Sequence, residues 1–437
     1  MKVSVHGLGH VGLVAAAALA AQGHQVLGLD IDRAVVGTLN KGHVVYFEPG
    51  LKEMVVEGLA SGRLRFAHLD DVKESPSEMA MICVGTPSLS NGGANLSYVR
   101  SAIRWIIAHE PRVDTVVMKS TVPPGTGRSL ATTMLQGTDI DYVSNSEFLR
   151  EGHAVQDWFH PDRIVVGASN PEALKRIKRL YQGIEAPYVE TDVTSAEMIK
   201  YASNAFLATK IAFVNEIANL CERMGATIDD VSLGIGMDPR IGPAMLRAGL
   251  GYGGSCFPKD VRALDFQSTA NGHSFELLRS VITVNNRQRL LPLLSLKETF
   301  GSLQGVPVAV LGLSFKPDTD DTRDAPALDL IPLLVEEGAE VRAYDPAAKA
   351  QGILPPEAKV CHDAYEALKG ARAAVLCTEW DEFVRLDWAE IAKAMEPPRL
   401  VFDGRNALDP GLLTSLGFDY RGVGRSPKAI RSPLRSA

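Results

Sequence analysis

Two short motifs carry the residues best suited to chemistry, and the first is a glycine-rich turn. The stretch GLGHVG places Gly7, Gly9 and Gly12 in a GxGxxG pattern directly after the apolar run Val3–Gly7. These glycines permit a tight turn, and the N-terminus of the helix that follows can receive a pyrophosphate. Asp30 ends the next apolar run, where its carboxylate can accept a hydrogen bond from an adenosine ribose hydroxyl. The motif predicts dinucleotide binding, and NAD is favoured because a carboxylate repels the extra phosphate of NADP.

The second motif surrounds a cysteine. Three glycines in the four residues Gly251–Gly254 free the backbone to wrap around a ligand. Pro258 suits the first turn of a helix, so Cys256 is predicted to lie at or just before a helix N-terminus. The helix dipole and Lys259 both favour the thiolate, which makes Cys256 the candidate nucleophile. Other cysteines lie in apolar runs and are expected to be buried: Cys83, Cys221 and Cys377.

A dinucleotide and a nucleophilic cysteine together limit the possible reactions. Oxidation of an alcohol to an aldehyde needs a base but no cysteine. Oxidation of an aldehyde to an acid uses one, because the thiolate adds to the carbonyl, the adduct gives up a hydride and water cleaves the thioester. The two motifs therefore favour a dehydrogenase whose product is a carboxylate.

Alternating apolar runs and helical stretches position these motifs. In the first half, short apolar strands separated by helices predict a parallel, doubly wound sheet. The pattern restarts at Val306–Gly312 and Glu340–Asp345, which predicts a second sheet of the same type. Between the halves, Thr194–Met224 contains neither proline nor glycine and predicts one long helix. The expected fold is α/β, with two Rossmann-like doubly wound parallel sheets joined by a long central helix that also offers a dimerisation surface.

Composition bounds the class of protein. The 437 residues leave room for about three domains, and 46% apolar with 22% charged residues is ordinary for a globular protein. A net charge of −7 gives no general attraction to nucleic acid or to an anionic membrane. Five scattered cysteines without a CxxC pair argue against a disulfide framework and a cysteine zinc site. We expect a cytoplasmic protein without a metal.

The chain as a whole resembles the nucleotide-sugar 6-dehydrogenase family. The blocks that carry the resemblance are Val5–Gly12, Ile82–Pro87, Ser120–Thr126, Glu147–Gly152, Glu197–Asn204, Asp238–Pro243, Gly251–Asp260 and Gly312–Arg323. This family oxidises the C6 alcohol of a nucleotide sugar to a carboxylate and reduces two NAD in turn. The resemblance implies an NAD-binding Rossmann domain at 1–193, a central helical region with the cysteine loop at 194–300, a nucleotide-sugar-binding domain at 301–424 and a flexible basic tail at 425–437.

The resemblance also implies the catalytic residues. Cys256 would be the nucleophile. Lys200 and Asn204, four residues apart and so on one helix face, would stabilise the oxyanion and position water. Asp260 would assist the proton transfers. Further acid–base and water-binding groups are Glu147 and Thr121.

Binding residues follow from the same resemblance. The implied cofactor contacts are Gly7, Gly9, Val11, Gly12, Asp30, Thr86, Thr121, Glu151, Lys259 and Arg323. The implied substrate contacts are Glu147, Phe148, Leu149, Arg150, Glu151, Lys200, Asn204, Met245, Leu246, Arg247, Ala248, Gly249, Gly253 and Lys316. Arg240 resembles an arginine that reaches the nucleotide of a neighbouring subunit, so we expect a homodimer or a higher homo-oligomer.

The choice of substrate is the main alternative that the residues leave open. The stretch Asp238–Pro243 (DPRIGP) favours UDP-glucose, and GDP-mannose remains the alternative within the family. A UDP-N-acetyl sugar is disfavoured because Phe-Pro-Lys-Asp follows Cys256. From a different class, the chain could be a non-catalytic NAD-binding redox sensor whose Cys256 is oxidised. Such a sensor needs neither the Lys200–Asn204 pair nor a second sheet.

Overall fold

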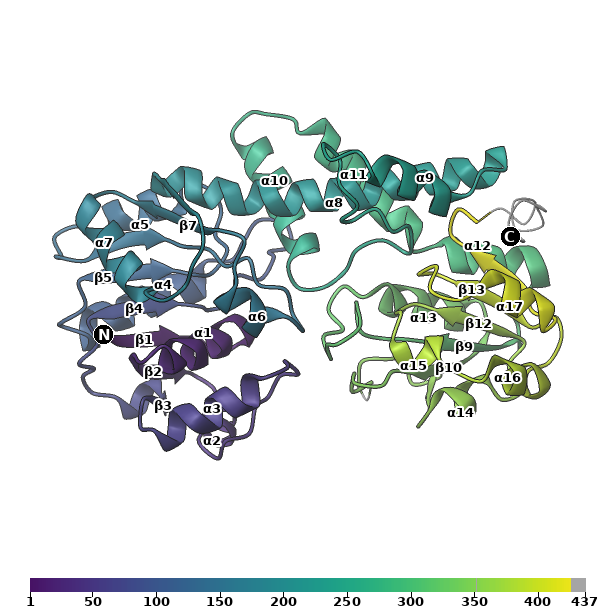
Figure 1. Ribbon diagram of the computed structural model, residues 1–437, viewed down its shortest axis with the longest axis horizontal. Helices are drawn as coiled ribbons and strands as arrows, with labels where there is room; N and C mark the ends of the chain where they lie inside the picture. The colour runs from purple at the N-terminus through teal and green to yellow at the C-terminus, as the bar shows by residue number, and fades with distance from the viewer. Residues whose placement is uncertain (351, 426–437) are drawn as a thin grey trace. The chain divides into compact units, whose positions relative to one another are not determined.

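The structure is a computed structural model that describes residues 1–350 and 352–425. The chain divides into two compact units (Figure 1). The N-terminal unit comprises Met1–Asn204 and Arg262–His273, and the C-terminal unit comprises Ala205–Val261 and the residues from Ser274 on. The boundary falls inside two helices, α8 (Val193–Met224) and α10 (Phe257–Ala270), so both helices contribute residues to each unit.

The N-terminal unit is built on a sheet with the strand order β3-β2-β1-β4-β5-β6-β7-β8. Its strands are β1 (Lys2–His6), β2 (Gln25–Asp30), β3 (Leu64–His68), β4 (Met79–Ile82), β5 (Thr115–Met118), β6 (Asp141–Ser144), β7 (Ile164–Ala168) and β8 (Tyr188–Thr191). Neighbouring strands pair in parallel except β6 and β7, which are antiparallel. The predicted doubly wound sheet is confirmed, and the order reverses beside β1, where such folds bind their ligands.

The helices of this unit cover the sheet, and the first is the most deeply packed. They are α1 (His10–Ala21), α2 (Arg33–Leu39), α3 (Leu51–Ala60), α4 (Ser97–His109), α5 (Thr126–Thr133), α6 (Ala154–Phe159) and α7 (Pro171–Leu180), with a 3-10 turn at Leu69–Asp71. Every residue of α1 from Gly12 to Ala20 is buried. A helix that is apolar all round has to be buried on every side, and its alanines allow the neighbouring helices to approach closely.

The C-terminal unit contains the second predicted sheet, with the order β11-β10-β9-β12-β13-β14 and parallel pairing throughout. Its strands are β9 (Pro307–Leu311), β10 (Glu340–Tyr344), β11 (Lys359–Val360), β12 (Ala373–Leu376), β13 (Leu400–Asp403) and β14 (Asp419–Gly422). Its remaining helices are α9 (Ile228–Gly236), α11 (Glu276–Gln288), α12 (Leu291–Phe300), α13 (Pro326–Glu336), α14 (Ala364–Leu368), α15 (Asp381–Val384), α16 (Trp388–Ala394) and α17 (Pro410–Ser415).

The long helix predicted at Thr194–Met224 is confirmed as α8, which has 32 residues and begins one residue earlier (Figure 1). At 1.5 Å per residue it is about 48 Å long. Gly225 follows its last residue with a φ of 79°, a left-handed conformation that ends helices and favours glycine.

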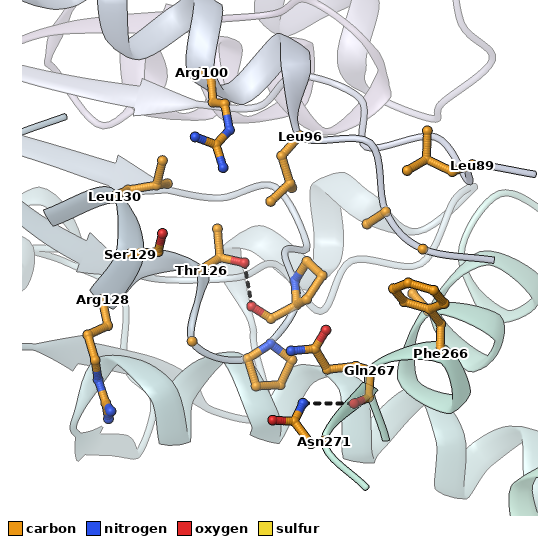
Figure 2. A pocket seen from close by; sticks show the side chains of 16 residues that line it. Leu89, Leu96, Arg100, Thr126, Arg128, Ser129, Leu130, Phe266, Gln267 and Asn271 are labelled. Atoms are coloured by element: carbon orange, nitrogen blue, oxygen red, sulfur yellow. Dashed lines mark hydrogen bonds between the residues drawn. The ribbon is translucent and has the colours of Figure 1, made fainter. Parts of the chain in front are cut away.

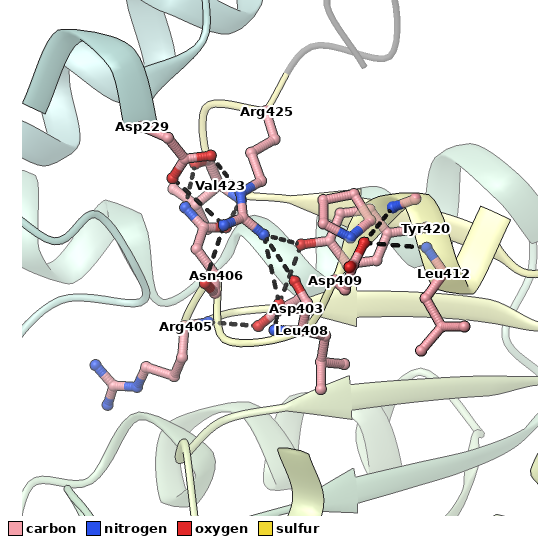
Figure 3. Close-up of polar contacts among 12 residues, drawn as sticks. Asp229, Asp403, Arg405, Asn406, Leu408, Asp409, Leu412, Tyr420, Val423 and Arg425 are labelled. Atoms are coloured by element: carbon pink, nitrogen blue, oxygen red, sulfur yellow. Dashed lines mark hydrogen bonds and ion pairs between the residues drawn. The ribbon is translucent and has the colours of Figure 1, made fainter. Parts of the chain in front are cut away.

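The predicted tail needs one correction, because its first residue, Arg425, is part of the C-terminal unit (Figure 3). Its guanidinium pairs with Asp229 of α9 at 2.9 Å and donates to the hydroxyl of Tyr420 at 2.5 Å. Behind them lies Asp403, which is fully buried and whose pKa is raised by that burial. A buried carboxylate is stable only with hydrogen-bond and charge partners, and Arg425 is one of the partners of Asp403. The rest of the predicted tail, 426–437, lies outside the described residues.

Candidate active site

The glycine-rich turn between β1 and α1 leaves a helix N-terminus open to a ligand. Gly7 has a φ of 91°, and a Cβ at Gly12 would lie 1.8 Å from the carbonyl oxygen of Gly7, so neither position accepts a side chain. A Cβ at Gly9 would meet nothing within 4 Å. Gly9 is the N-cap of α1, and no side chain caps the helix there. The free amides of the first turn can therefore bind an anion, and Val11 lies in that turn.

Asp30 lies beside this turn at the end of β2. One carboxylate oxygen accepts from the backbone amide of Leu8 at 2.6 Å, and the other accepts from that of Asp32 at 2.9 Å. These bonds fix the carboxylate next to the glycines, where a ribose hydroxyl of a dinucleotide would lie. The residues present therefore fit a dinucleotide.

Two threonines lie at the same edge of the sheet. Thr86 follows β4, which pairs with β1, and Thr121 follows β5, which pairs with β4. The hydroxyl of Thr86 donates to the carbonyl oxygen of Thr121 at 2.9 Å. This bond ties the two loops together beside the switch point of the sheet.

A buried ion pair lies in the N-terminal unit between the loop after β6 and helix α8. Lys200 donates to a carboxylate oxygen of Glu147 at 3.2 Å, and the other oxygen accepts from the backbone amide of Leu149. The ammonium of Lys200 also lies 5.0 Å from the ring centroid of Phe148. Asn204 follows one turn later on the same helix and is 5% exposed. The structure thus brings together Glu147 and Lys200, which the sequence separates by 53 residues.

Two other residues of this loop, Arg150 and Gly152, bond to groups other than the Lys200–Glu147 pair. The guanidinium of Arg150 is largely exposed and pairs with Asp157 at 2.6 Å. The amide of Gly152, directly after Glu151, donates to the buried carboxylate of Glu48 at 2.8 Å. Glu48 also accepts from His10, the first residue of α1, at 2.9 Å. Sequence reasoning missed Glu48, which joins the predicted substrate loop to the dinucleotide turn.

Burial alone would raise the pKa of Glu48, but the hydrogen bonds from His10 and Gly152 outweigh it and the pKa is lowered. Glu48 is therefore a carboxylate at neutral pH. Its charge faces the first turn of α1, which a helix dipole favours.

Sequence reasoning also missed Lys119, the residue directly after β5. Its ammonium is buried and donates to the hydroxyl of Tyr181 at 2.7 Å and to the side-chain oxygen of Asn145 at 3.1 Å. Burial lowers the pKa of Lys119 to about 8, with nearby Cys83 and Glu147 opposing the shift. A lysine directly after an apolar strand was the available signal, because such a position faces the ligand edge of a parallel sheet.

Cys256 in the C-terminal unit immediately precedes helix α10. It is partly exposed, whereas the other four cysteines are buried. Burial raises the pKa of both Cys83 and Cys377 to about 12, which keeps those thiols inert at neutral pH. Lys259 in the first turn of α10 forms an ion pair with Asp260, and the Asp260 side chain is almost fully buried.

The glycines before Cys256 serve packing within the chain itself. A Cβ at Gly253 would lie 2.3 Å from the carbonyl oxygen of Asp324, and one at Gly254 would lie 2.8 Å from the ring of Phe315. Gly251 is equally tight against Asn285. From the sequence, we interpret these glycines as allowing the backbone to wrap around a ligand. In the structure, Gly253 and Gly254 allow the cysteine loop to pack closely against the loop after β9. The ammonium of Lys316 lies 5.6 Å from the ring centroid of Phe315.

The neighbouring loop at 245–249 is braced rather than free. Met245 has a φ of 62°, which is rare for a residue with a side chain. The amide of Gly249 donates to the side-chain oxygen of Asn215 at 2.9 Å. Leu246 and Ala248 are buried, whereas Arg247 is exposed.

Arg405, which sequence reasoning missed, connects three loops of the C-terminal unit. Its guanidinium donates to the carbonyl oxygens of Cys377 at 2.7 Å, Phe315 at 3.1 Å and Gly251 at 3.2 Å. These loops follow parallel strands or lead to Cys256, so Arg405 fixes the shape of this edge of the sheet.

The two remaining predicted arginines are exposed. Arg323 pairs with Asp321 at 2.7 Å, and Arg240 pairs with Asp238 at 2.6 Å. The guanidinium of Arg240 is 86% exposed, so it points into solvent from its own chain.

A cavity of about 480 Å³ lies in the N-terminal unit between the loop around Leu89, the start of α5 and the end of α10 (Figure 2). Its walls include Pro123, Thr126 and Phe266. None of the predicted cofactor- or substrate-binding residues lines it.

None of the described helices is long and apolar enough to span a membrane. Within the described part of the chain, no cluster of three or more histidine, cysteine or acidic side chains could hold a metal ion.

Comparison with known proteins covers nearly the whole length of the chain. Three domain descriptions of one family match: the NAD binding domain at residues 1–185, the central domain at 194–287 and the UDP binding domain at 309–410. The chain is 43% identical to UDP-glucose 6-dehydrogenase YwqF of Bacillus subtilis over 431 residues, 97% of this chain and 98% of the relative. It is also 43% identical to UDP-glucose 6-dehydrogenase of Rhizobium meliloti, over 97% of this chain and all of that relative.

A solved structure agrees with the sequence comparison. A UDP-glucose dehydrogenase from Pyrobaculum islandicum is 36% identical and superimposes with a TM-score of 0.88, covering 97% of this chain and 98% of that one. The resemblance predicted from the sequence blocks is confirmed. The chain belongs to the UDP-glucose/GDP-mannose dehydrogenase family.

Proposed function

We propose that this chain is an NAD-dependent UDP-glucose 6-dehydrogenase that oxidises UDP-glucose to UDP-glucuronate. One observation carries the proposal: the partly exposed cysteine at a helix N-terminus, Cys256, occurs in a chain that also has an open dinucleotide turn. The names of its relatives support the substrate. We retain the predicted functional domains at 1–193, 194–300 and 301–424.

Cofactor binding follows from the N-terminal unit. The amides at the start of α1 would receive the pyrophosphate of NAD, Asp30 would accept from its adenosine ribose, and Thr86 and Thr121 would contact the cofactor from the loops after β4 and β5. NAD, when bound, accepts a hydride in each of the two oxidations. Glu151, Lys259 and Arg323 are the further proposed cofactor contacts.

The chain's own residues carry the acyl chemistry. The thiolate of Cys256 adds to the aldehyde carbon at C6, the adduct gives up the C6 hydride to become a thioester, and water cleaves the thioester to release the acid and the thiol. Lys200 and Asn204 donate to the carbonyl oxygen as negative charge develops on it. Asp260 and Glu147 take up and return protons, and Thr121 positions water.

The nucleotide end of the substrate belongs to the C-terminal unit. Lys316 supplies positive charge near the loop after β9, while the braced loop 245–249 and Gly253 supply backbone groups. Arg405 keeps these loops in place. The match of residues 309–410 to a UDP binding domain supports this assignment. The further proposed substrate contacts, in the N-terminal unit, are Glu147, Phe148, Leu149, Arg150 and Glu151.

We also propose that the enzyme is a homodimer built on α8 and α9. Exposed apolar side chains recur every seven residues along α8, which is the spacing of one helix face. They are Phe206, Phe213 and Leu220, followed by Met224, and Leu233 and Met237 extend them on α9. Several large apolar side chains exposed on neighbouring turns of one helix are unusual on a monomer. The exposed Arg240 nearby in sequence would then reach the nucleotide of the second subunit. Five scattered cysteines without a CxxC pair fit the reducing cytoplasm as its location.

The test is an assay of NADH formation with UDP-glucose, GDP-mannose and UDP-N-acetyl sugars at equal concentrations. We expect UDP-glucose to give the highest kcat/KM, with UDP but not GDP as a competitive inhibitor. Preference for GDP-mannose would reassign the substrate within the family. No turnover of any nucleotide sugar, together with reversible oxidation of Cys256, would support a redox sensor instead.

A further inference from the structure

Glu197 is a buried carboxylate in the N-terminal unit to which the sequence assigns no role. It lies in the second turn of α8 and is fully buried. One oxygen accepts from the backbone amide of Gly125 at 2.7 Å, and the other accepts from that of Gly127 at 2.8 Å. The hydroxyl of Tyr142 on β6 donates to the same group at 3.3 Å. Glu197 therefore caps the N-terminus of α5 from a different helix.

The packing around this cap is tight on both sides. A Cβ at Gly127 would lie 2.2 Å from the ring of Tyr142 and 2.5 Å from the side chain of Val193, the first residue of α8. A Cβ at Gly167 on β7 would lie 2.5 Å from that of Ala196. Glycines at these two positions let the first turns of α8 lie directly against α5 and the sheet. The carboxylate of Glu197 then fixes the orientation of the helix, because backbone amides bind it in one geometry.

The residues that share these elements are those of the proposed chemistry. Lys200 follows Glu197 by three residues on α8, and Thr121 precedes Gly125 by four residues in the loop that leads to α5. We infer that Glu197 is a positioning residue, which holds the Lys200 face of α8 at a fixed place relative to the Thr121 loop. The inference rests on the proposed function for its catalytic consequence, but the geometry it describes lies wholly within the N-terminal unit.

The ionisation state of Glu197 is consistent with this role. Burial raises its pKa to about 7, although the amides of Gly127 and Gly125 and the hydroxyl of Tyr142 all stabilise the charged form. The hydrogen bonds that both oxygens accept offset part of the cost of burying this group.

The variant that tests the inference is Glu197→Gln, which keeps the volume of the side chain but replaces one acceptor oxygen by a donor. The matched control is Glu110→Gln. Glu110 is also a buried carboxylate of the N-terminal unit, and it accepts from the hydroxyl of Ser4 at 2.9 Å. Displacing a catalytic group by about 1 Å can lower a rate by about a hundredfold. We expect kcat of Glu197→Gln to fall by about tenfold or more, with KM for UDP-glucose and NAD changed by less than about threefold.

A milder variant covers the case in which Glu197→Gln does not fold. Tyr142→Phe removes only the hydroxyl that donates to the carboxylate and leaves the ring that packs on Gly127. We expect a smaller fall in kcat, again at nearly constant KM. In the double variant the two effects on kcat should be less than multiplicative, because both act through one group.

Hydrogen exchange separates this inference from the proposed function, since it needs no substrate. The amides of Gly125 and Gly127 and the first turns of α8 should exchange faster in Glu197→Gln than in Glu110→Gln. Wild-type protein inactive on every nucleotide sugar would overturn the proposed function only. Unchanged exchange at these amides, or kcat within about twofold of the wild type, would overturn the positioning role.

Discussion

Lys200 donates a hydrogen bond to Glu147 at 3.2 Å, and the side chains of this ion pair are only 5% and 6% exposed. The pair joins α8 to the loop after β6, and the charge of each buried side chain is compensated by the other. Removing one partner leaves an uncompensated charge in the interior, which destabilises a protein more than replacing both does.

The first prediction concerns the stability of this pair. Lys200→Met and Glu147→Gln should each lower the free energy of unfolding by about 3 to 5 kcal/mol. The double variant should lose less than the sum, because it buries no lone charge. Urea denaturation followed by circular dichroism measures all three. Additive losses would mean that the two side chains do not stabilise each other.

Cofactor preference tests the dinucleotide turn. Because Asp30 is fixed beside the turn by the amides of Leu8 and Asp32, NAD should be preferred over NADP by at least about tenfold, or about 1.4 kcal/mol. Asp30→Ala should narrow this gap. The measurement is kcat/KM with each cofactor at saturating nucleotide sugar. Equal values for the two cofactors in the wild type would contradict the assignment of Asp30.

Arg425 should stabilise the C-terminal unit. Its guanidinium lies between Asp229, the hydroxyl of Tyr420 and the buried Asp403. Arg425→Ala should lower the free energy of unfolding by about 3 kcal/mol, because it leaves a buried carboxylate with fewer partners. Arg385→Ala is the control, since that arginine forms an exposed pair with Asp381 and should change stability by less than about 1 kcal/mol. Equal effects of the two substitutions would show that the Arg425 cluster adds nothing to stability.

The raised pKa of Glu197 has a consequence for stability. Because its folded-state pKa is about 7 against an ordinary value of 4.5, the folded protein binds this proton more tightly than the unfolded chain. Its contribution to stability is therefore full below pH 4.5 and is lost as pH rises to about 7, by up to about 3 kcal/mol. In Glu197→Gln this part of the pH dependence should be absent. Parallel stability curves for variant and wild type between pH 4.5 and 7 would contradict the shift.

Much of the fold and the main chemical groups could be predicted from the sequence. The glycine turn, Asp30 and the long helix α8 each follow from local patterns that can be recognised in a single sequence. Cys256 at a helix N-terminus follows from one proline two residues later. These features are encoded by neighbours in sequence, so no tertiary information was needed to find them.

The supporting residues could not be predicted because their partners are distant in sequence. Glu48 bonds Gly152 across 104 residues, and Glu197 bonds Gly125 across 72. Arg405 bonds the carbonyl oxygen of Gly251 across 154 residues. A lone glutamate or arginine has no pattern of its own, and its role depends on which backbone groups the fold brings near it.

The central claim is that Cys256 carries the second oxidation, and one paired measurement tests it. The ratio of NADH formed to UDP-glucose consumed should be two in the wild type. Cys256→Ala should still bind NAD and UDP-glucose but lose UDP-glucuronate formation by several orders of magnitude, because covalent catalysis is removed. Cys377→Ala, at a buried thiol, should keep the ratio of two. A Cys256→Ala enzyme that formed UDP-glucuronate at a near-normal rate would contradict the account.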